Sequence, residues 1–307
     1  MAELGLHGMP SFGDAPRTLD QYREVLDRLP AAFTSVWLSD HLQDDDGGWN
    51  EAWTTLTYLT ALYPRFRFGH LVLSQSYRNP ALLAKMGATL ASLSGGRIVM
   101  GLGAGWLQAE YDAYNYPYPR AGIRVAQLGE TIQVMKAMWT QWPATFEGEH
   151  YAIRGAYCDP RPASPIPVLV GSNGPKALRI VAEHADWWAW DGPWDPTYQR
   201  PYEILRAHCM DIGRPFEEIT LVAELTIEMP DDPATFEPTY TNEVAYPGQV
   251  FPIVGPRPED VVREIETLVD HGVSHVVVNI STMTELDRFI AEVLPAVRLT
   301  RTIAAAT

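Results

Sequence analysis

The sequence of 307 residues is poor in cysteine, in basic side chains and in long hydrophobic runs. Its two cysteines, Cys158 and Cys209, lack a metal-binding spacing and are too few for a disulfide scaffold, so we expect a reducing, cytoplasmic setting. The 23 basic residues against 38 acidic ones give a net charge of -15, which argues against binding to nucleic acid or to an anionic membrane surface. No apolar run approaches the roughly 20 residues that a membrane-spanning helix needs. The N-terminus also lacks the basic flank and apolar stretch of a signal peptide.

Several catalytic signatures are also missing. The chain has neither a Ser/His/Asp nucleophile elbow nor a P-loop. The segment GLGAGW at 101–106 has the spacing G-x-G-x-G, and no acidic residue ends a following strand, which disfavours dinucleotide binding of the Rossmann type. His271 and His275 have the i, i+4 spacing of a metal pair, but Gly272 ends the helix between them, so we expect no metal there. The three aspartates at 44–46 have the chemistry to bind a hard cation, but a solvated acidic loop is the favoured interpretation.

What the chain does contain is a regular alternation of strand-like and helix-like segments. The stretch 67–111 shows it most clearly, with a buried strand, a helix opened by Asn79-Pro80 and a second buried strand. Two buried strands that are joined by a helix are expected to run parallel. The same pattern predicts eight strands, each followed by a helix, at 3–8, 33–42, 68–74, 97–103, 167–172, 185–192, 219–229 and 273–280.

Eight such repeats without a shift in composition predict one α/β domain over residues 1–307, a (β/α)8 TIM barrel. The alternative is a doubly wound open sheet, which usually has fewer strands. Two insertions interrupt the rhythm. Residues 143–165 suit a small hairpin followed by a proline-rich segment, and residues 230–256 have no apolar period. Long loops of the second kind are typical of lids, binding loops or mobile segments.

A barrel places its active site at the carboxyl ends of the strands. Glycines at 103–105 and 171–174 allow backbone N–H groups to approach an anion or a flat ring, although they are also compatible with simple strand ends. Because 171–174 leads directly into a helix, it predicts a phosphate site. His41, beside Asp40, is a candidate acid/base or cofactor-holding residue, and a structural histidine is the alternative. The strand ends as a group are Asp40-His41, Ser74-Gln75-Ser76, Gly103-Ala104-Gly105-Trp106, Gly171-Ser172-Asn173-Gly174, Asp191-Gly192 and Asn279.

Several independent motifs occur in a recognisable order. They are SDHL at 39–42, EAWTTL at 51–56, YRNPALLAKMGATLASLSGGR at 77–97, GLGAGWLQAEYDAY at 101–114, TFEGEHY at 145–151, AYCDPRP at 156–162 and VLVGSNGPKALRIVAEHADWW at 168–188. In this order they resemble the luciferase-like flavin-dependent oxidoreductases, and more narrowly the branch that depends on the deazaflavin coenzyme F420. The resemblance is close over roughly residues 33 to 190 and looser toward the end.

This resemblance implies a barrel that assembles as a homodimer and holds a flavin at its C-terminal mouth. It also implies a non-prolyl cis peptide bulge behind the ring, at about Leu71-Val72. In the sugar-phosphate dehydrogenase of the family a catalytic glutamate follows the GxG loop, and Trp106 stands at that place here, which argues against sugar-phosphate oxidation. The cofactor-binding residues that the resemblance and the strand ends predict are Asp40, Leu71, Val72, Ser74, Gly103, Gly105, Trp106, Gly171, Ser172, Asn173 and Gly174.

The activity implied is hydride transfer between C5 of coenzyme F420 and a small organic substrate, with His41 as acid/base. We expect no metal and no macromolecular partner other than a second copy of the chain. One alternative is an FMN-dependent monooxygenase of the same fold that uses oxygen. The other is a flavin-binding barrel without catalytic activity.

Overall fold

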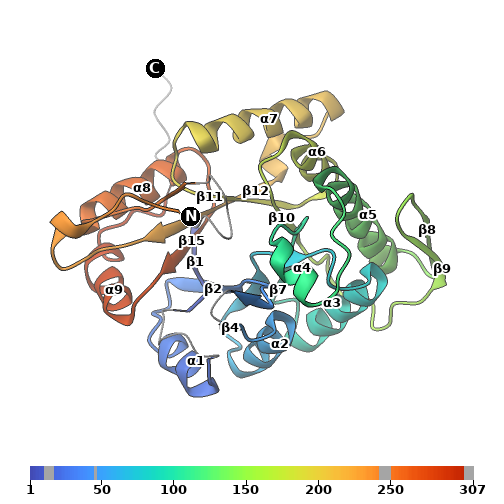
Figure 1. Cartoon of the computed structure of the whole chain (residues 1–307), viewed down its shortest axis with the longest axis horizontal. Helices are drawn as coiled ribbons and strands as arrows, with labels where there is room; N and C mark the ends of the chain where they lie inside the picture. The colour runs from blue at the N-terminus through green and yellow to red at the C-terminus, as the bar shows by residue number, and fades with distance from the viewer. Residues whose placement is uncertain (10–16, 45–46, 242–249, 301–307) are drawn as a thin grey trace.

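The computed structural model describes residues 1–9, 17–44, 47–241 and 250–300, and a closed ring of parallel strands lies at its centre (Figure 1). Each strand pairs with the next along the ring, and the pairing of β7 with β10 joins its two halves. The predicted (β/α)8 barrel is therefore confirmed and the open sheet is wrong. The ring consists of β1 (Glu3–His7), β2 (Phe33–Leu38), β5 (Arg67–His70), β7 (Ile98–Gly103), β10 (Val168–Gly171), β11 (Trp187–Asp191), β12 (Thr220–Ile227) and β15 (His275–Ile280).

Helices surround this ring and cover its outer face (Figure 1). Their ends follow the local sequence: Thr18 forms a capping box before the first helix, and Asn79 accepts from two backbone N–H groups before the third. The helices are α1 (Leu19–Leu26), α2 (Ala52–Leu62), α3 (Pro80–Ser94), α4 (Gln108–Ala113), α5 (Ala121–Thr140), α6 (Pro175–His184), α7 (Pro196–Ile212), α8 (Pro258–Asp270) and α9 (Met283–Arg288).

Some predicted boundaries are wrong. The apolar residues at helical spacing predict a long helix from Val125, and the structure begins it one turn earlier, at Ala121. The sequence pattern also predicts a last helix over 284–299, where the structure has α9 followed by a π-helical segment, Phe289–Val293. The predicted strand 33–42 ends at Leu38.

The third strand is interrupted in the way that the resemblance implied. A cis peptide bond joins Leu71 to Val72, and the strand resumes as β6 (Leu73–Ser74), which pairs with the end of β7. The bulge therefore lies at the carboxyl end of the barrel, where the active site was expected.

The two insertions contain different secondary structure. The first contains the predicted hairpin, β8 (Ala144–Glu147) and β9 (Ala152–Ala156). The described part of the second contains a 3-10 turn at Pro233–Thr235 and a two-stranded pairing of β13 (Thr239–Tyr240) with β14 (Phe251–Pro252). Two further short elements are the ladder of β3 (Gln43–Asp44) with β4 (Gly47–Gly48) and a 3-10 turn at Phe216–Glu218.

The barrel interior is layered because side chains alternate along each strand. A small apolar cluster fills its middle, formed by Trp37, Val99, Leu169, Ala189, Val222 and Val277. Two residues further along the strands, the same inward face carries polar groups such as Asp191, Glu224 and Asn279. The larger core lies between the strands and the helices. Among the described residues no helix has both the length and the hydropathy to cross a bilayer.

Candidate active site

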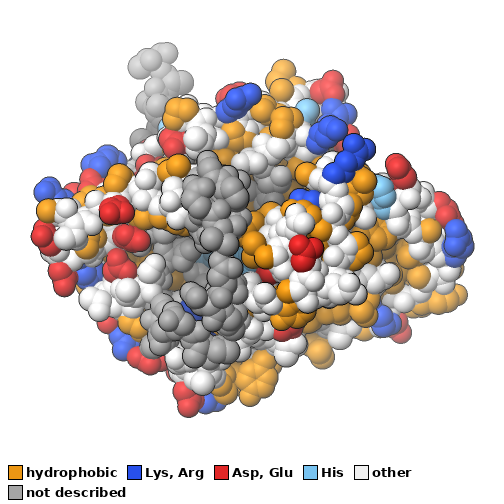
Figure 2. Space-filling view, in the orientation of Figure 1, with side chains coloured by type: hydrophobic (Ala, Val, Ile, Leu, Met, Phe, Trp, Pro, Cys, Tyr) orange, Lys and Arg blue, Asp and Glu red, His pale blue; other side chains and the backbone are white. Residues whose placement is uncertain are grey.

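A cavity of about 780 Å³ opens at the carboxyl ends of the barrel strands. In Figure 2 hydrophobic side chains gather over α4, beside the centre of the face shown, and Trp106 and Tyr114 of this region are partly exposed. Of the predicted site residues, Gly174 lies outside the lining. The cavity wall brings together His41, Asp40, Leu71, Val72, Ser74, Gly103, Gly105, Trp106, Gly171, Ser172 and Asn173.

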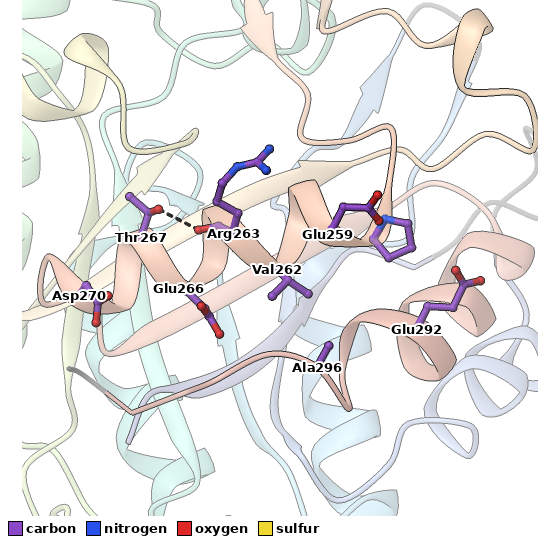
Figure 3. A pocket seen from close by; sticks show the side chains of 9 residues that line it. Glu259, Val262, Arg263, Glu266, Thr267, Asp270, Glu292 and Ala296 are labelled. Carbon is purple, nitrogen blue, oxygen red and sulfur yellow. Dashed lines mark hydrogen bonds between the residues drawn. The ribbon is translucent and has the colours of Figure 1, made fainter.

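A second hollow, of about 490 Å³, lies on the outside of the barrel between α8 and the π-helical segment (Figure 3). Its charged groups are surface pairs such as Arg263 with Asp260 within one helical turn. Such exposed pairs are screened by solvent and carry no specific chemistry. The cavity at the strand ends is therefore the candidate active site.

His41 is held in the cavity wall by Glu110, a residue that the strand ends did not reveal. The Nδ1 atom of His41 lies 3.2 Å from Oε2 of Glu110. The rings of Trp49 and Trp106 stand against the imidazole, at centroid distances of 5.3 and 5.4 Å. With Nδ1 directed at a carboxylate, the neutral imidazole carries its proton on Nδ1 and presents a basic Nε2 on the opposite side of the ring.

Glu110 itself is buried, with 2% of its surface exposed, and every contact it makes is with a donor. The backbone N–H groups of Leu42 and Gln43 donate to Oε1, and the hydroxyl of Tyr77 donates to Oε2 across 3.1 Å. Burial alone would raise the pKa of Glu110, but the hydrogen bond and charge of His41 together with the two backbone N–H groups lower it. Glu110 is thus a fixed anion behind the histidine.

Asp40 has a different surrounding from the one that the sequence suggested. Its carboxylate accepts a bidentate pair of hydrogen bonds from Arg78, at 2.7 and 2.9 Å, and a third from the backbone N–H of Ser74. Arg78 is also paired with Glu51. Asp40 thus ties the end of β2 to the bulge, and contact between its carboxylate and a cofactor stays a prediction.

Replacing Arg78 by Met is expected to destabilise the fold by about 3 kcal/mol, because it leaves the carboxylate of Asp40 buried without its cation. The double change Arg78→Met with Asp40→Asn should cost less than the single one, since it removes the unpaired charge. Chemical denaturation of the three proteins measures both values. Equal stabilities of wild type and Arg78→Met would contradict the structural role of this pair.

The side chain of Val72 at the cis bulge lies between two glycines of neighbouring strands. A Cβ atom on Gly103 would lie 2.6 Å from Cγ2 of Val72, and one on Gly171 would lie 2.9 Å from Cγ1. These glycines are therefore required by the packing of Val72, in addition to any approach by a ligand. The apolar bulge and the two bare backbone stretches together form a smooth wall of the cavity.

Gly105 closes the adjacent loop in a conformation that favours glycine, with φ of +76°. A Cβ atom here would lie 1.7 Å from the hydroxyl of Tyr111, which in turn hydrogen-bonds to Oγ of Ser74 across 2.8 Å. The loop 103–105, the bulge and α4 are thus packed as one unit. This packing positions Trp106 and Glu110 in contact with His41.

The predicted phosphate loop has the expected form. Gly171, Ser172 and Asn173 line the cavity, and Gly174 is the N-cap of α6 without any side-chain cap. Uncapped N–H groups at a helix N-terminus bind anions because of their orientation and partial positive charge. The residues present therefore fit a phosphate, and this role remains a prediction.

A second group of ionisable side chains lies on the wall formed by β1, β11 and β12. Nδ1 of His7 is paired with Oε1 of Glu224, and Nε2 of His7 lies 3.0 Å from Oγ of Ser39. Asp191 is the register partner of Glu224 on the neighbouring strand. Burial and the negative charge of Glu224 raise the pKa of Asp191 to about 7, against the opposing effect of His7.

Sequence reasoning missed Glu110, His7 and Glu224. Glu110 lies on a short helix, away from any strand end. Glu224 was visible as a charged residue within an apolar strand, which is a usable signal in retrospect. His271 and His275, which we expected not to form a metal site, have different surroundings. His275 is buried against Oγ of Ser35, and His271 stacks on Trp194. Across the described part of the chain no cluster of metal-ligating side chains occurs.

The chain is thus a closed (β/α)8 barrel, and its mouth carries the cis bulge, the glycine loops and the pair of His41 with the buried Glu110. The family model described as luciferase-like monooxygenase matches residues 10–272, and the chain belongs to that family. A curated relative, the F420-dependent glucose-6-phosphate dehydrogenase of Intrasporangium calvum, is 29% identical over 90% of this chain and 95% of its own length.

Two solved structures share the fold over nearly the whole chain. One is an F420-dependent secondary alcohol dehydrogenase in complex with an F420-acetone adduct, with a TM-score of 0.79, 19% identity and coverage of 97% of this chain and 99% of that one. The other is the coenzyme F420 dependent tetrahydromethanopterin reductase from Methanopyrus kandleri, with a TM-score of 0.77, 19% identity and the same coverage. At this identity the likeness establishes the fold of the barrel.

Proposed function

We propose that the protein is an F420-dependent oxidoreductase that transfers a hydride between the deazaflavin and a small organic substrate, with His41 as acid/base. The observation that carries this proposal is the buried Glu110 carboxylate on Nδ1 of His41, at the wall of the cavity. A carboxylate in this position fixes the orientation of an imidazole and stabilises its protonated form, as a proton-transfer residue requires. The curated relative named above supports coenzyme F420 as the cofactor.

The residues present fit such a cofactor. The bulge at Leu71-Val72 with Gly103 and Gly171 offers a flat apolar wall, and the uncapped start of α6 offers donors to a phosphate. The cavity of about 780 Å³ falls within the range of roughly 300–1,000 Å³ that is usual for cofactor and ligand sites. When bound, the deazaflavin supplies a ring carbon, C5, that accepts or returns a hydride.

The chain's own residues complete the reaction. For an alcohol substrate, Nε2 of His41 takes the hydroxyl proton while the hydride leaves the carbon that bears the hydroxyl, so that a carbonyl forms. In the reverse direction the imidazolium returns that proton to the carbonyl oxygen. Glu110 keeps the ring oriented in both directions, and the rings of Trp49 and Trp106 pack against it.

Titration of the purified chain with coenzyme F420 and with FMN tests the proposal. We expect F420 to bind at micromolar concentration and FMN at least tenfold more weakly, and we expect no oxygen consumption by the reduced, loaded protein. Tight binding of FMN alone with oxygen consumption would establish the monooxygenase alternative. Binding of F420 without turnover of any alcohol or carbonyl in a broad panel would favour the non-catalytic barrel.

We further propose that the protein is a cytoplasmic homodimer. Both thiols, Cys158 and Cys209, are free and buried, which is typical of reducing compartments. The neighbouring helices α2 and α3 expose apolar side chains that a partner copy can cover, namely Tyr58, Leu62, Leu82 and Leu93. Sedimentation equilibrium measures the mass in solution, and a monomer at micromolar concentration would reject this assembly.

A further inference from the structure

The cavity has an acidic wall opposite the bulge, and its charges differ from those that a phosphorylated substrate needs. Among the described residues that line it, no Lys or Arg occurs. The segments outside the described residues that adjoin these positions in the chain, 10–16, 45–46 and 242–249, also contain no Lys or Arg. Recognition of a phosphate monoester in proteins relies on such cations in addition to backbone donors.

The acidic wall itself leaves one carboxylate without a partner. His7 and Glu224 form a pair with little exposure, 10% and 12% of their side chains. Although burial alone would lower it, the negative charges of Glu224 and Asp191 and the hydrogen bond to Glu224 raise the pKa of His7. Asp191 is the carboxylate that has no partner. Within the described chain its carboxylate makes no hydrogen bond or ion pair, and it lines the cavity.

A further observation at the same wall indicates a ligand. Tyr240 faces the two acids from β13, and burial together with their charges raises its pKa to about 12, so it remains a neutral donor. The neutral hydroxyl of Tyr240 and the unpaired carboxylate of Asp191 suit a ligand that carries both a cation and an acceptor atom.

We propose that this wall, formed by Asp191 with Glu224, His7 and Tyr240, binds a protonated amine on the substrate, with Asp191 as its counter-ion. The substrate class is therefore an amine-bearing alcohol or carbonyl compound, in place of a sugar phosphate. This proposal rests on the proposed function for the reacting part of the substrate. An ammonium group next to Asp191 and Glu224 also relieves the repulsion between two like charges at paired positions of adjacent strands.

Isothermal titration calorimetry at pH 8 tests the charge preference with three probes that share a phenyl ring and differ in charge. They are benzylamine, benzyl alcohol and benzoate. We expect wild type to bind benzylamine about tenfold more tightly than benzyl alcohol, and benzoate most weakly. Asp191→Asn should abolish the preference for benzylamine without weakening benzyl alcohol. Glu217→Gln, which removes an exposed acid outside the cavity, should retain it.

A pH series provides an independent readout. The groups that face Asp191 are His7, Glu224 and Tyr240, and its own pKa is about 7. As the pH falls from 8 to 5.5, Asp191 gains a proton while benzylamine stays charged, so the affinity for benzylamine should decrease and that for benzyl alcohol should not. A flat profile for benzylamine would contradict the role of Asp191.

The outcomes separate the two proposals. Equal or tighter binding of benzoate, or unchanged benzylamine affinity in Asp191→Asn, overturns the amine site, whether or not F420 binds. Failure of F420 to bind overturns the proposed function, and the probe titrations can still be read on the cofactor-free chain. Repeating them with F420 bound establishes that the probes occupy the part of the cavity that the cofactor leaves open.

Discussion

Replacing Glu110 by Gln is expected to lower kcat by a factor of about 10² to 10³. The carboxylate receives four donors on two oxygens: the N–H groups of Leu42 and Gln43, the hydroxyl of Tyr77 and Nδ1 of His41. An amide offers only one acceptor oxygen and turns an NH₂ group toward two of these donors. The histidine then loses either its orientation or its hydrogen bond, and the stabilising charge is lost in both cases.

The same mismatch has a cost in stability. Burying an NH₂ group against N–H donors should lower the free energy of unfolding of Glu110→Gln by about 2 to 3 kcal/mol. Tyr77→Phe removes only one of the four donors and should lower kcat a few-fold. His41→Asn should cost as much activity as Glu110→Gln or more, and the double variant little beyond the single ones, because the two residues act as a unit.

Steady-state kinetics on alcohol or carbonyl substrates, with circular dichroism melts of each variant, measure these effects. Glu217→Gln is the matched control for loss of a carboxylate, since Glu217 is exposed and does not line the cavity. A folded Glu110→Gln protein with wild-type kcat would show that His41 does not depend on this carboxylate, and the acid/base assignment would fail with it.

Gly103→Ala is expected to disrupt the cofactor wall, and Val72→Ala is expected to restore it. The added Cβ would lie 2.6 Å from Cγ2 of Val72, which is closer than any ordinary contact, and a β-branched side chain has little freedom to move. Overpacking of this kind costs about 1 to 3 kcal/mol. Because the displaced atom belongs to the bulge, we also expect F420 affinity to fall by about tenfold or more.

The distances between Val72 and the added Cβ explain why Val72→Ala should rescue Gly103→Ala. In the Val72→Ala background the nearest remaining side-chain atom, Cβ, lies 3.8 Å from the new Cβ on Gly103, which is ordinary van der Waals contact. The double variant should therefore be more stable than the sum of the single changes predicts. Gly171→Ala, at 2.9 Å from Cγ1, should behave in the same way with a smaller effect.

Gly122→Ala is the matched control, because a Cβ at this exposed position in α5 meets nothing within 4 Å. It should be neutral or slightly stabilising, as Ala is the better helix former. Thermal melts and F420 titrations of the set decide the question. Additive effects of Gly103→Ala and Val72→Ala would show that the two side chains do not compete for this space.

The barrel and the side on which its site lies could be predicted from the sequence. Apolar runs and helical periodicity are local properties, and eight of them in alternation leave few closed arrangements. The residues that follow strands, such as His41 and Gly171–Gly174, were found because parallel strands end at one face. Even the position of the bulge at Leu71-Val72 followed from a resemblance in the local motifs and is present in the structure.

The partners of these residues were decided only by the tertiary structure. His41 and Glu110 are 69 positions apart, and His7 and Glu224 are 217 apart, so no local pattern connects them. Which side chains meet at the mouth depends on the register of strands around a closed ring and on how α4 packs against it. For the same reason the local sequence could not reveal that Asp40 is engaged by Arg78, or that Asp191 is left unpaired beside Glu224. The sequence by itself determined the barrel and its active face. The closure of the ring determined which charged side chains are paired on that face and which are left for a ligand.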